Sequence, residues 1–521
     1  MSDEFAKQVG EAYAFTGAAL ELGALVTGNE AHPDTRIRMP LSMLNRHGLV
    51  AGATGTGKTK TLQLMAEQLS AAGVPCFLAD IKGDVSGMAA PGVPGDRIAT
   101  RSRDVGDEWA PAAFPVEFLS IGGVGTGAAV RATMTGFGPQ LLAKVLGLND
   151  VQESSLGLVF HYADRAGLPL LDLKDLRAVI SFLVSEEGKA ELQGLGGLSS
   201  STAGVLLREL VALEDQGAGV FFGEPEFDTA DLLRVTPDGR GVVSVMELQG
   251  LQDRPAVFST FLMWLLADLF HDLPEVGDLD KPKLVFFFDE AHLLFDDASK
   301  GFLDAVAQTV RLIRSKGVGV FFVTQTPKDV PADVLAQLGN RIQHALRAFT
   351  PQDAKALKAT VGTFPRTEEY DLEELLTQLG IGEAVVTILS ERGAPTPVAW
   401  TRLRAPRSLM AQLDPAQQQS LVAASPVAQR YATAIDRESA YERLAARLAP
   451  PPEAPAARPE PEPRAKKEKH HAEAAAAGGV MGALGGFLGS SMGRSMSRSI
   501  GSAIGREITR SIFGTARRRR R

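Results

Sequence analysis

Continuously apolar runs alternate with helix-like stretches over most of the first 400 residues. Two of the stretches, Val257–Phe270 and Phe302–Arg314, carry apolar residues at helical spacing. A strand that is buried on both faces is continuously apolar, so the alternation predicts an α/β fold built on a parallel sheet. The expected strands are Val74–Ala79, Val116–Ile121, Gly241–Glu247, Lys283–Phe288 and Val318–Thr324.

The pattern changes between residues 138 and 235, where apolar residues recur three or four positions apart. We interpret this stretch as an α-helical insertion that divides a core formed by residues 46–137 and 236–400. The apolar positions are Leu141, Leu142, Val145, Leu146, Leu156, Val159, Phe160, Leu176, Val179, Ile180 and Leu183.

Shorter segments flank this core. Residues 1–45 form a lead-in with an Ala-rich helix and a strand near Ile37–Met39, and a last strand pair is expected at 340–345 and 384–389. The remaining segments are a C-terminal helical segment at 401–449 with a helix at 426–449, a Pro/Glu/Ala/Lys linker at 450–471, and a Gly/Arg-rich basic tail at 472–521.

A glycine-rich phosphate loop follows the short apolar run that ends at Val50. Residues 51–59 read AGATGTGKT and fit the Walker A pattern of P-loop NTPases, and a helical pattern follows. Glycines let backbone N–H groups surround a triphosphate, a lysine bridges the β- and γ-phosphates, and a hydroxyl holds Mg²⁺. The expected nucleotide-binding residues are Gly52, Ala53, Thr54, Gly55, Thr56, Gly57, Lys58, Thr59 and Lys60. The motif therefore predicts binding of ATP and Mg²⁺.

A second motif, at residues 284–290, has the Walker B form of an apolar run followed by two acids. Asp289 is expected to hold Mg²⁺ together with Thr59, and Glu290 to orient and polarise the attacking water. Gln325 ends the next expected strand and is a candidate for contacting the γ-phosphate or this water; the alternative is a turn residue before a proline.

Three charged residues, Asp80, Lys82 and Asp84, follow the strand after the P-loop helix. They either tune Mg²⁺ and water or serve as surface turn residues, and the sequence does not separate these possibilities. His292 is expected to be a helix-start residue, since no partner His/Cys cluster accompanies it.

Composition narrows the class of protein. The single cysteine, Cys76, excludes an internal disulfide or a Cys-rich metal site, and neither a signal peptide nor an 18-residue apolar run is visible, so a cytoplasmic protein is expected. Residues 450–521 carry 14 Lys/Arg and 6 Asp/Glu, which leaves a net charge of −16 on the rest of the chain. The body is therefore a poor general binder of nucleic acid, and polyanion contact needs a local basic surface such as a pore or the tail.

The order of the motifs resembles that of the HerA–FtsK superfamily. GATGTGKT comes first, followed by FFFDEAH, then by an arginine before KGVGVFFVTQTP, and last by GNRI. This order looks closest to bacterial HerA C-terminal-like (YjgR-like) ATPases, over roughly residues 20–400. The resemblance implies an additional-strand, RecA-like P-loop NTPase that forms a ring, commonly a hexamer, and that acts as a DNA translocase or helicase-like motor. Fewer than 50 residues precede the P-loop, too few for the N-terminal β-barrel of archaeal HerA.

The same resemblance suggests roles for three arginines. Arg314 falls where the superfamily carries an arginine before a Gly-containing strand, proposed to reach a neighbouring subunit's γ-phosphate. Arg341 in GNRIQ is the rival for this arginine finger, and a solvated helix-end residue is the alternative for Arg314. Arg46 matches a family arginine near the nucleotide.

The tail has a period of four from Leu484 onward, with apolar, small and basic positions, and ends in Arg517–Arg521. It is either a solvated tail, an attachment to nucleic acid, or a contact with an anionic membrane surface. For the whole protein, the alternative to a motor is a nucleotide-gated assembly scaffold or a membrane-surface ATPase without a DNA substrate.

Overall fold

The computed structural model describes residues 3–192, 194–251, 254–295 and 298–448. The chain divides into two compact units, residues 1–441 and 442–521. The first unit contains the whole sheet and helices α1 to α16. Of the second unit the structure describes only residues 442–448, which belong to helix α17. The expected linker and tail lie outside the described residues.

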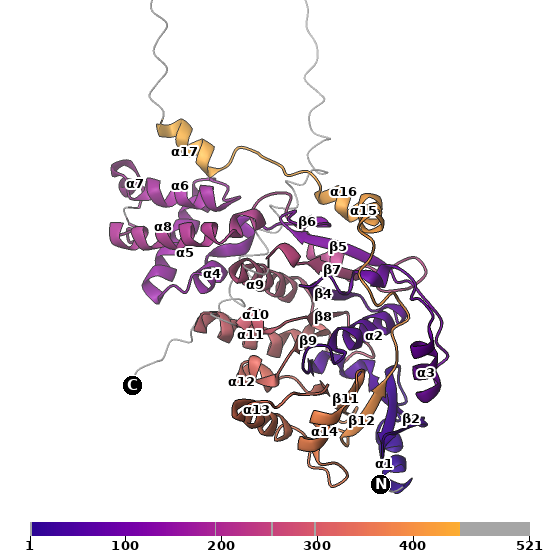
Figure 1. Ribbon diagram of the computed structural model, residues 1–521. Helices are drawn as coiled ribbons and strands as arrows, with labels where there is room; N and C mark the ends of the chain where they lie inside the picture. The colour runs from indigo at the N-terminus through magenta and orange to yellow at the C-terminus, as the bar shows by residue number, and fades with distance from the viewer. Residues whose placement is uncertain (1–2, 193, 252–253, 296–297, 449–521) are drawn as a thin grey trace, which may run out of the picture. The chain divides into compact units, whose positions relative to one another are not determined.

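A mixed sheet of twelve strands is the framework of the first unit (Figure 1). Its order is β2-β1-β12-β11-β10-β3-β9-β8-β4-β7-β5-β6, and the eight strands from β10 to β6 run parallel. The strands are β1 (Ala19–Thr27), β2 (Glu30–Pro40), β3 (Gly48–Ala51), β4 (Cys76–Asp80), β5 (Val116–Ile121), β6 (Ala128–Val130), β7 (Val243–Glu247), β8 (Leu284–Phe288), β9 (Val318–Thr324), β10 (Asn340–Gln343), β11 (Glu383–Thr387) and β12 (Ala399–Leu403). The α/β fold class with a large, mostly parallel sheet is confirmed.

The other four strands form an antiparallel edge that the alternation pattern did not predict. β10 pairs with β11, β11 with β12, β12 with β1 and β1 with β2, all antiparallel. The β1–β2 hairpin turns at Gly28 and Asn29, whose φ angles of 57° and 72° suit a two-residue turn between twisted strands. The lead-in strand near Ile37–Met39 thus lies in β2 and extends the main sheet.

Both faces of the parallel region are covered by helices, which explains why its central strands β4, β8 and β9 are almost entirely apolar. Side chains alternate between the two faces of a strand. On β8, Phe287 stacks on Phe321 in the core that also holds α2, whereas Phe286 and Phe288 lie against Phe77 on the α9 side. The sheet is therefore the middle layer between α2 and α9 (Figure 1).

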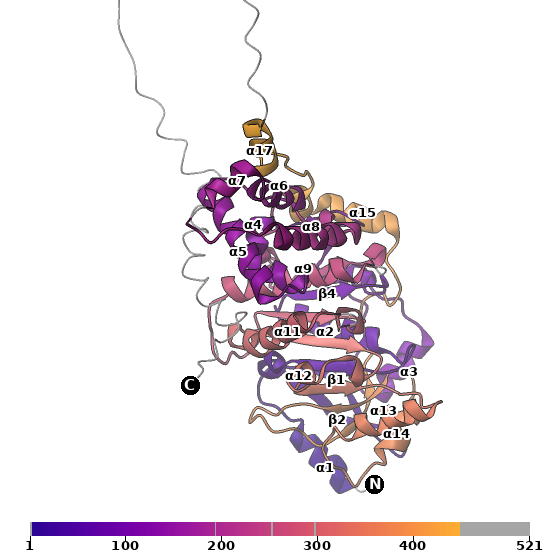
Figure 2. The same ribbon diagram turned by 90° about the vertical axis from the view of Figure 1, so that its left-hand side faces the viewer.

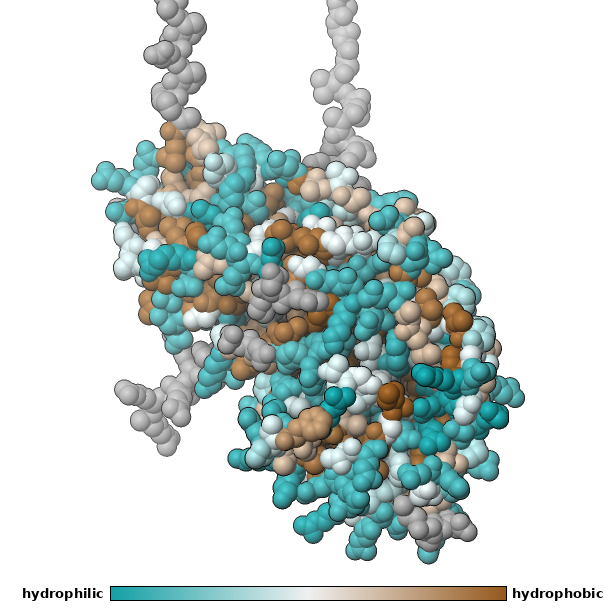
Figure 3. All heavy atoms as spheres, in the orientation of Figure 1, coloured by the Kyte–Doolittle hydropathy of each residue, from teal (hydrophilic) through white to brown (hydrophobic). Residues whose placement is uncertain are grey.

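The helices confirm most of the expected pattern, including a cluster of helices α4–α8 at one end of the sheet in both views (Figures 1 and 2). Their bounds are α1 (Asp3–Ala12), α2 (Lys58–Ala71), α3 (Asp96–Asp104), α4 (Met134–Val145), α5 (Asp150–Arg165), α6 (Leu173–Leu183), α7 (Glu186–Glu191), α8 (Ser200–Asp215), α9 (Pro255–Asp272), α10 (His292–Phe295), α11 (Lys300–Ile313), α12 (Ala332–Leu335), α13 (Pro351–Val361), α14 (Leu372–Gln378), α15 (Pro415–Ala424), α16 (Pro426–Tyr431) and α17 (Ala440–Leu448). The surface seen in Figure 3 is mixed, with hydrophobic residues in small groups between hydrophilic ones.

The single helix expected at 426–449 is wrong, because the chain leaves the helix after Tyr431. The Tyr431 hydroxyl donates to Asp231 at 2.8 Å, and its ring packs on Phe227. The Ile435 N–H donates to the Glu224 carbonyl oxygen at 3.0 Å, which holds the connecting segment in an extended bridge. These long-range contacts outweigh the helical propensity of the segment.

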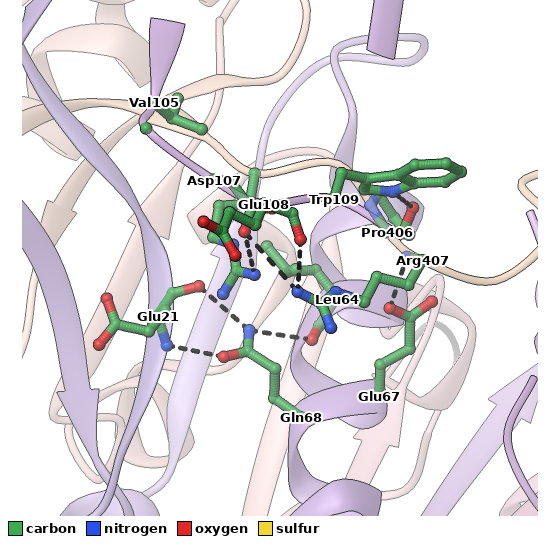
Figure 4. A network of polar contacts seen from close by, with 12 residues as sticks. Glu21, Leu64, Glu67, Gln68, Val105, Asp107, Glu108, Trp109, Pro406 and Arg407 are labelled. Carbon is green, nitrogen blue, oxygen red and sulfur yellow. Dashed lines mark hydrogen bonds and ion pairs between the residues drawn. The ribbon is translucent and has the colours of Figure 1, made fainter. Parts of the chain in front are cut away.

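After β12 the chain crosses helix α2 as an extended segment, residues 404–413, which we call the strap. The Glu67 carboxylate on α2 accepts hydrogen bonds from the backbone N–H groups of Arg407 and Ser408 at 2.8 and 3.0 Å. Trp109 donates from Nε1 to the Pro406 carbonyl oxygen at 2.8 Å (Figure 4). The strap therefore fixes the helix that follows the P-loop.

Candidate functional site

The P-loop leaves the sheet between β9 and β10, and its glycines are required by close contacts. The Gly52 N–H donates to the Thr324 carbonyl oxygen at 3.2 Å, and the Ala53 N–H to Ala345 at 2.8 Å. Gly52 has φ 154°, and a Cβ there would lie 2.4 Å from the Cβ of His344. Gly55 and Gly57 also have positive φ, a backbone region that glycine enters freely. The loop is thus held open by its backbone.

Lys58 begins α2, and its ammonium group points back into the loop. Nζ donates to the carbonyl oxygens of Gly52 and Ala53 at 2.7 and 3.2 Å. Burial lowers the pKa of Lys58, while the carboxylates of Glu290 and Asp289 act in the opposite direction. Lys58 is therefore part of the same electrostatic cluster as the two acids. Thr59 follows it in the first turn of α2, where N–H groups without helical partners favour an anion.

Asp289 and Glu290 follow β8, two strands from the P-loop strand β3. Asp289 is 4% exposed, and burial together with Glu290 raises the pKa of its carboxyl to about 6. Its Oδ1 accepts a hydrogen bond from the Glu290 N–H at 2.9 Å. Glu290 has φ 48°, an uncommon conformation for a side chain of this size and one that is often found at functional sites.

The Glu290 carboxylate is held by Lys82 and lies near His292. Oε1 accepts a hydrogen bond from the Lys82 ammonium group, and Oε2 lies 3.3 Å from His292 Nδ1. Burial raises the pKa of Glu290, but the Lys82 hydrogen bond and charge outweigh it and hold the pKa below its usual value. His292 begins α10, as expected for a helix-start residue, and also faces the acid.

The loop that carries Lys82 is shaped by Asp80. The Asp80 carboxylate accepts hydrogen bonds from the backbone N–H groups of Lys82, Gly83 and Val85 at 3.2, 2.8 and 3.1 Å. Gln412 of the strap donates to the Lys82 carbonyl oxygen at 2.9 Å. Asp80 is thus a turn-forming residue, whereas Lys82 reaches the acid pair; the sequence had left these possibilities open.

Gln325 and His344 lie on either side of the P-loop strand. Gln325 follows β9 and its side chain is exposed. His344 follows β10, is fully buried, and has Nε2 2.9 Å from the Thr61 hydroxyl. Burial, reinforced by the charge of Lys58, lowers the pKa of His344 to about 4. The sequence analysis missed His344 as a residue of this site. The one feature of the sequence that could have indicated it is its position near the end of the strand expected at 340–345.

The three candidate arginines lie toward the amino ends of the parallel strands. Arg46 ends a 3-10 helix before β3, Arg314 begins one before β9, and Arg341 lies opposite Leu49 near the start of β10. The P-loop and the acids lie at the carboxyl ends, so the seven residues of β9 separate Arg314 from them by about 20 Å. Arg46 contacts Asp278 at 3.6 Å. Within one chain, Arg314 and Arg46 therefore lie at the opposite end of the parallel strands from the phosphate site, whereas Arg341 lies within the short strand β10.

The chemistry of the acids fits Mg²⁺. Asp289 is a buried carboxylate whose charge is opposed by burial, and Thr59 offers a hydroxyl on the P-loop side. Mg²⁺ is commonly bound by one or two carboxylates together with substrate phosphates rather than by a protein cage. The described residues include no group of three His, Cys, Asp or Glu side chains that could hold a metal ion.

None of the helices that the structure describes combines the length and the apolar character needed to cross a membrane.

Comparisons with known proteins agree with this geometry. The family model described as "Helicase HerA-like C-terminal" matches residues 26–521. A probable helicase of Methanocaldococcus jannaschii is 32% identical over 154 residues, covering 28% of each chain. The DNA double-strand break repair helicase HerA of Saccharolobus solfataricus is 22% identical over 371 residues, covering 70% of this chain. The chain spans 28% and 65% of the lengths of these two relatives.

Solved structures of bacterial coupling proteins share the fold. TrwBdeltaN70 has a TM-score of 0.52 at 15% identity, with 79% of this chain and 94% of that chain covered. TrwB in complex with a non-hydrolysable ATP analogue has a TM-score of 0.50 at 16% identity, with 77% and 98% covered. The match of the family model over nearly the entire sequence shows that this chain belongs to the HerA-like helicase C-terminal family, as the order of its motifs had suggested.

Proposed function

We propose that this protein is a Mg²⁺-dependent ATPase that assembles into a ring and moves along DNA. The observation that carries the ATPase proposal is the meeting of the P-loop and the acids Asp289 and Glu290 at one edge of the sheet. Membership of a helicase family and the nucleotide complexes of TrwB support it.

The residues divide into binding and activating groups. The Lys58 ammonium group, now bonded to loop carbonyls, exchanges these for oxygens of the β- and γ-phosphates. Thr59 and Asp289 hold Mg²⁺, which neutralises phosphate charge when bound. Glu290 orients the attacking water and accepts its proton at the carboxylate, and Gln325 contacts the γ-phosphate or this water.

Two substitutions separate binding from hydrolysis. Lys58→Ala is expected to abolish tight ATP binding, whereas Glu290→Gln retains binding and loses about 10²–10⁴-fold in turnover, the usual contribution of a positioned base. Glu187→Gln, at an exposed position on α7, is the matched control. The measurements are equilibrium binding of ATP and steady-state hydrolysis. Near wild-type turnover by Glu290→Gln would show that another group activates water.

The position of Arg314 supports the proposed ring. Because Arg314 lies about 20 Å from the P-loop of its own chain, an arginine finger at this position would act on the site of a neighbouring subunit. Mixing inactive Lys58→Ala subunits with inactive Arg314→Ala subunits should therefore restore some hydrolysis, since some interfaces pair an intact lysine with an intact arginine. Restoration only with Arg341→Ala subunits would identify Arg341 as the finger. A fully active monomer would contradict both the ring and the trans arginine.

The polymer along which the proposed ring moves is identified by measuring how ATP hydrolysis responds to added nucleic acid. The name of the Saccharolobus relative, a DNA repair helicase, supports DNA as the track. We expect double-stranded DNA to stimulate turnover more than single-stranded DNA or RNA. Turnover that is unchanged by all three polymers would favour the scaffold or membrane-surface alternative.

A further inference from the structure

An exposed isoleucine lies on a short loop that is attached directly to the P-loop. The loop, residues 380–382, precedes β11, and the side chain of Ile381 is 75% exposed. The Gly382 N–H donates to the Thr56 carbonyl oxygen at 3.0 Å. A Cβ on Gly57 would lie 3.3 Å from the Gly382 nitrogen, so the two glycine-containing segments are in close contact.

The loop is held rigidly from both sides. Arg101 of α3 donates from Nη1 to the Gly382 carbonyl oxygen at 3.0 Å and from Nη2 to the Ile381 carbonyl oxygen at 2.8 Å. The Leu403 N–H of β12 also donates to Gly382 at 3.0 Å. Single exposed apolar residues are ordinary on protein surfaces (Figure 3). This one differs because its backbone is fixed at the edge of a phosphate site.

The order of the strands decides which end of a nucleotide faces this loop. Asp289 and Glu290 lie beyond β9 on one side of β3, so the γ-phosphate points to that side. The loop 380–382 lies beyond β10 on the other side of β3. A nucleoside triphosphate is a linear chain, so the end opposite the γ-phosphate, which carries the base, emerges toward Ile381.

We infer that the side chain of Ile381 forms an apolar contact surface for the nucleobase, which we call the seat. Arg101 is the residue that positions the loop carrying Ile381. This inference rests on the proposed ATPase function and adds a base-binding element to the phosphate site. A flat base covers the exposed isoleucine face, and the backbone bonds from Arg101 and Thr56 keep the seat at a fixed place relative to the phosphates.

The test compares ligands that do and do not carry a base. Equilibrium affinities for ATP and ADP, and for inorganic tripolyphosphate with Mg²⁺, are measured on the full chain and on Ile381→Ala. We expect ATP and ADP binding to weaken about 5- to 10-fold, the effect of losing one or two buried methyl contacts, with tripolyphosphate binding unchanged. Ile381→Met, which keeps an apolar side chain, should restore most of the affinity, and Val151→Ala, at a 68% exposed position on α5, is the control.

The outcomes are distinguishable. If the wild-type chain binds neither ATP nor tripolyphosphate, the proposed ATPase function fails. If it binds ATP no more tightly than tripolyphosphate, or if Ile381→Ala leaves ATP affinity unchanged, the phosphate site stands and the seat is refuted. Equal weakening of all ligands would show that the substitution distorts the P-loop, which also overturns the seat.

Discussion

A buried histidine beside two of the candidate arginines should make the fold sensitive to acid. His47 is 2% exposed, and its Nδ1 accepts a hydrogen bond from the Val320 N–H at 3.1 Å. Burial lowers the pKa of His47 to about 4, although a backbone contact at Val310 favours the charged form; Arg314 and Arg46 lower the pKa further. Protonation of Nδ1 would remove the acceptor that Val320 uses.

The size and sign of the effect follow from this shift. Above pH 6.5, the ordinary pKa of His, the ring is neutral in both the folded and the unfolded chain. Between pH 6.5 and about 4 only the unfolded chain gains the proton, so the free energy of unfolding decreases as the pH falls. At 1.36 kcal/mol per pH unit, the full loss from this one residue is about 3.4 kcal/mol.

His47→Asn isolates this contribution. The asparagine Oδ1 is placed to accept the Val320 bond but does not titrate. We expect the acid-induced loss of stability between pH 7 and pH 4.5 to be smaller than in the wild type by about 2–3 kcal/mol, measured by urea unfolding followed by circular dichroism. His161→Asn, at an exposed position on α5, is the control. Identical pH dependence of wild type and His47→Asn would refute the reasoning.

Three further predictions concern the P-loop, the acid pair and the tail. Gly52→Ala should abolish ATP binding, because a Cβ there would lie 2.4 Å from His344, whereas Gly95→Ala, which meets nothing within 4 Å, should bind normally. Lys82→Met should lower the free energy of unfolding by about 1–2 kcal/mol in thermal denaturation, since it leaves the buried Glu290 without its main partner; Lys82→Arg should retain stability, and equal loss in both would argue against the ion pair. Deletion of residues 466–521 should preserve basal ATPase activity and remove the salt-sensitive part of DNA or anionic vesicle binding; unchanged binding at low salt would return the tail to a solvated role.

The strands near the site could be predicted because burial leaves a strong sequence signal there. β5 and β9 have the expected bounds, and β8 differs by one residue. Every residue of β8 and β9 is buried and their sequences are almost entirely apolar, whereas β5 also contains Glu117 and Ser120. The P-loop could be predicted because its glycines meet a local requirement of the backbone. The pattern gave no sign of α3, whose sequence DRIATRSRD is almost entirely polar.

The remaining parts of the site depend on contacts between distant segments. Lys82 meets Glu290 across 208 positions, and His344 meets Thr61 across 283. Pairings of this kind leave no periodicity in either segment, so they could not be predicted from a single sequence. For Arg314 the position before β9 was visible, but its place at the opposite end of the sheet from the P-loop depends on the parallel pairing of β3 with β9.

The pairing of β1 with β12 sets the order in which the chain can complete its fold during synthesis. The two strands are separated by roughly 370 residues, and the strap that covers α2 follows β12. At about 5–20 residues per second, a ribosome needs about 20–75 s to make the intervening chain. Throughout this time the β1–β2 hairpin has an unpaired edge and the P-loop helix lacks its cover. A chain that is released before residue 403 would keep both surfaces exposed, which makes early termination products of this protein expected clients of chaperones and proteases.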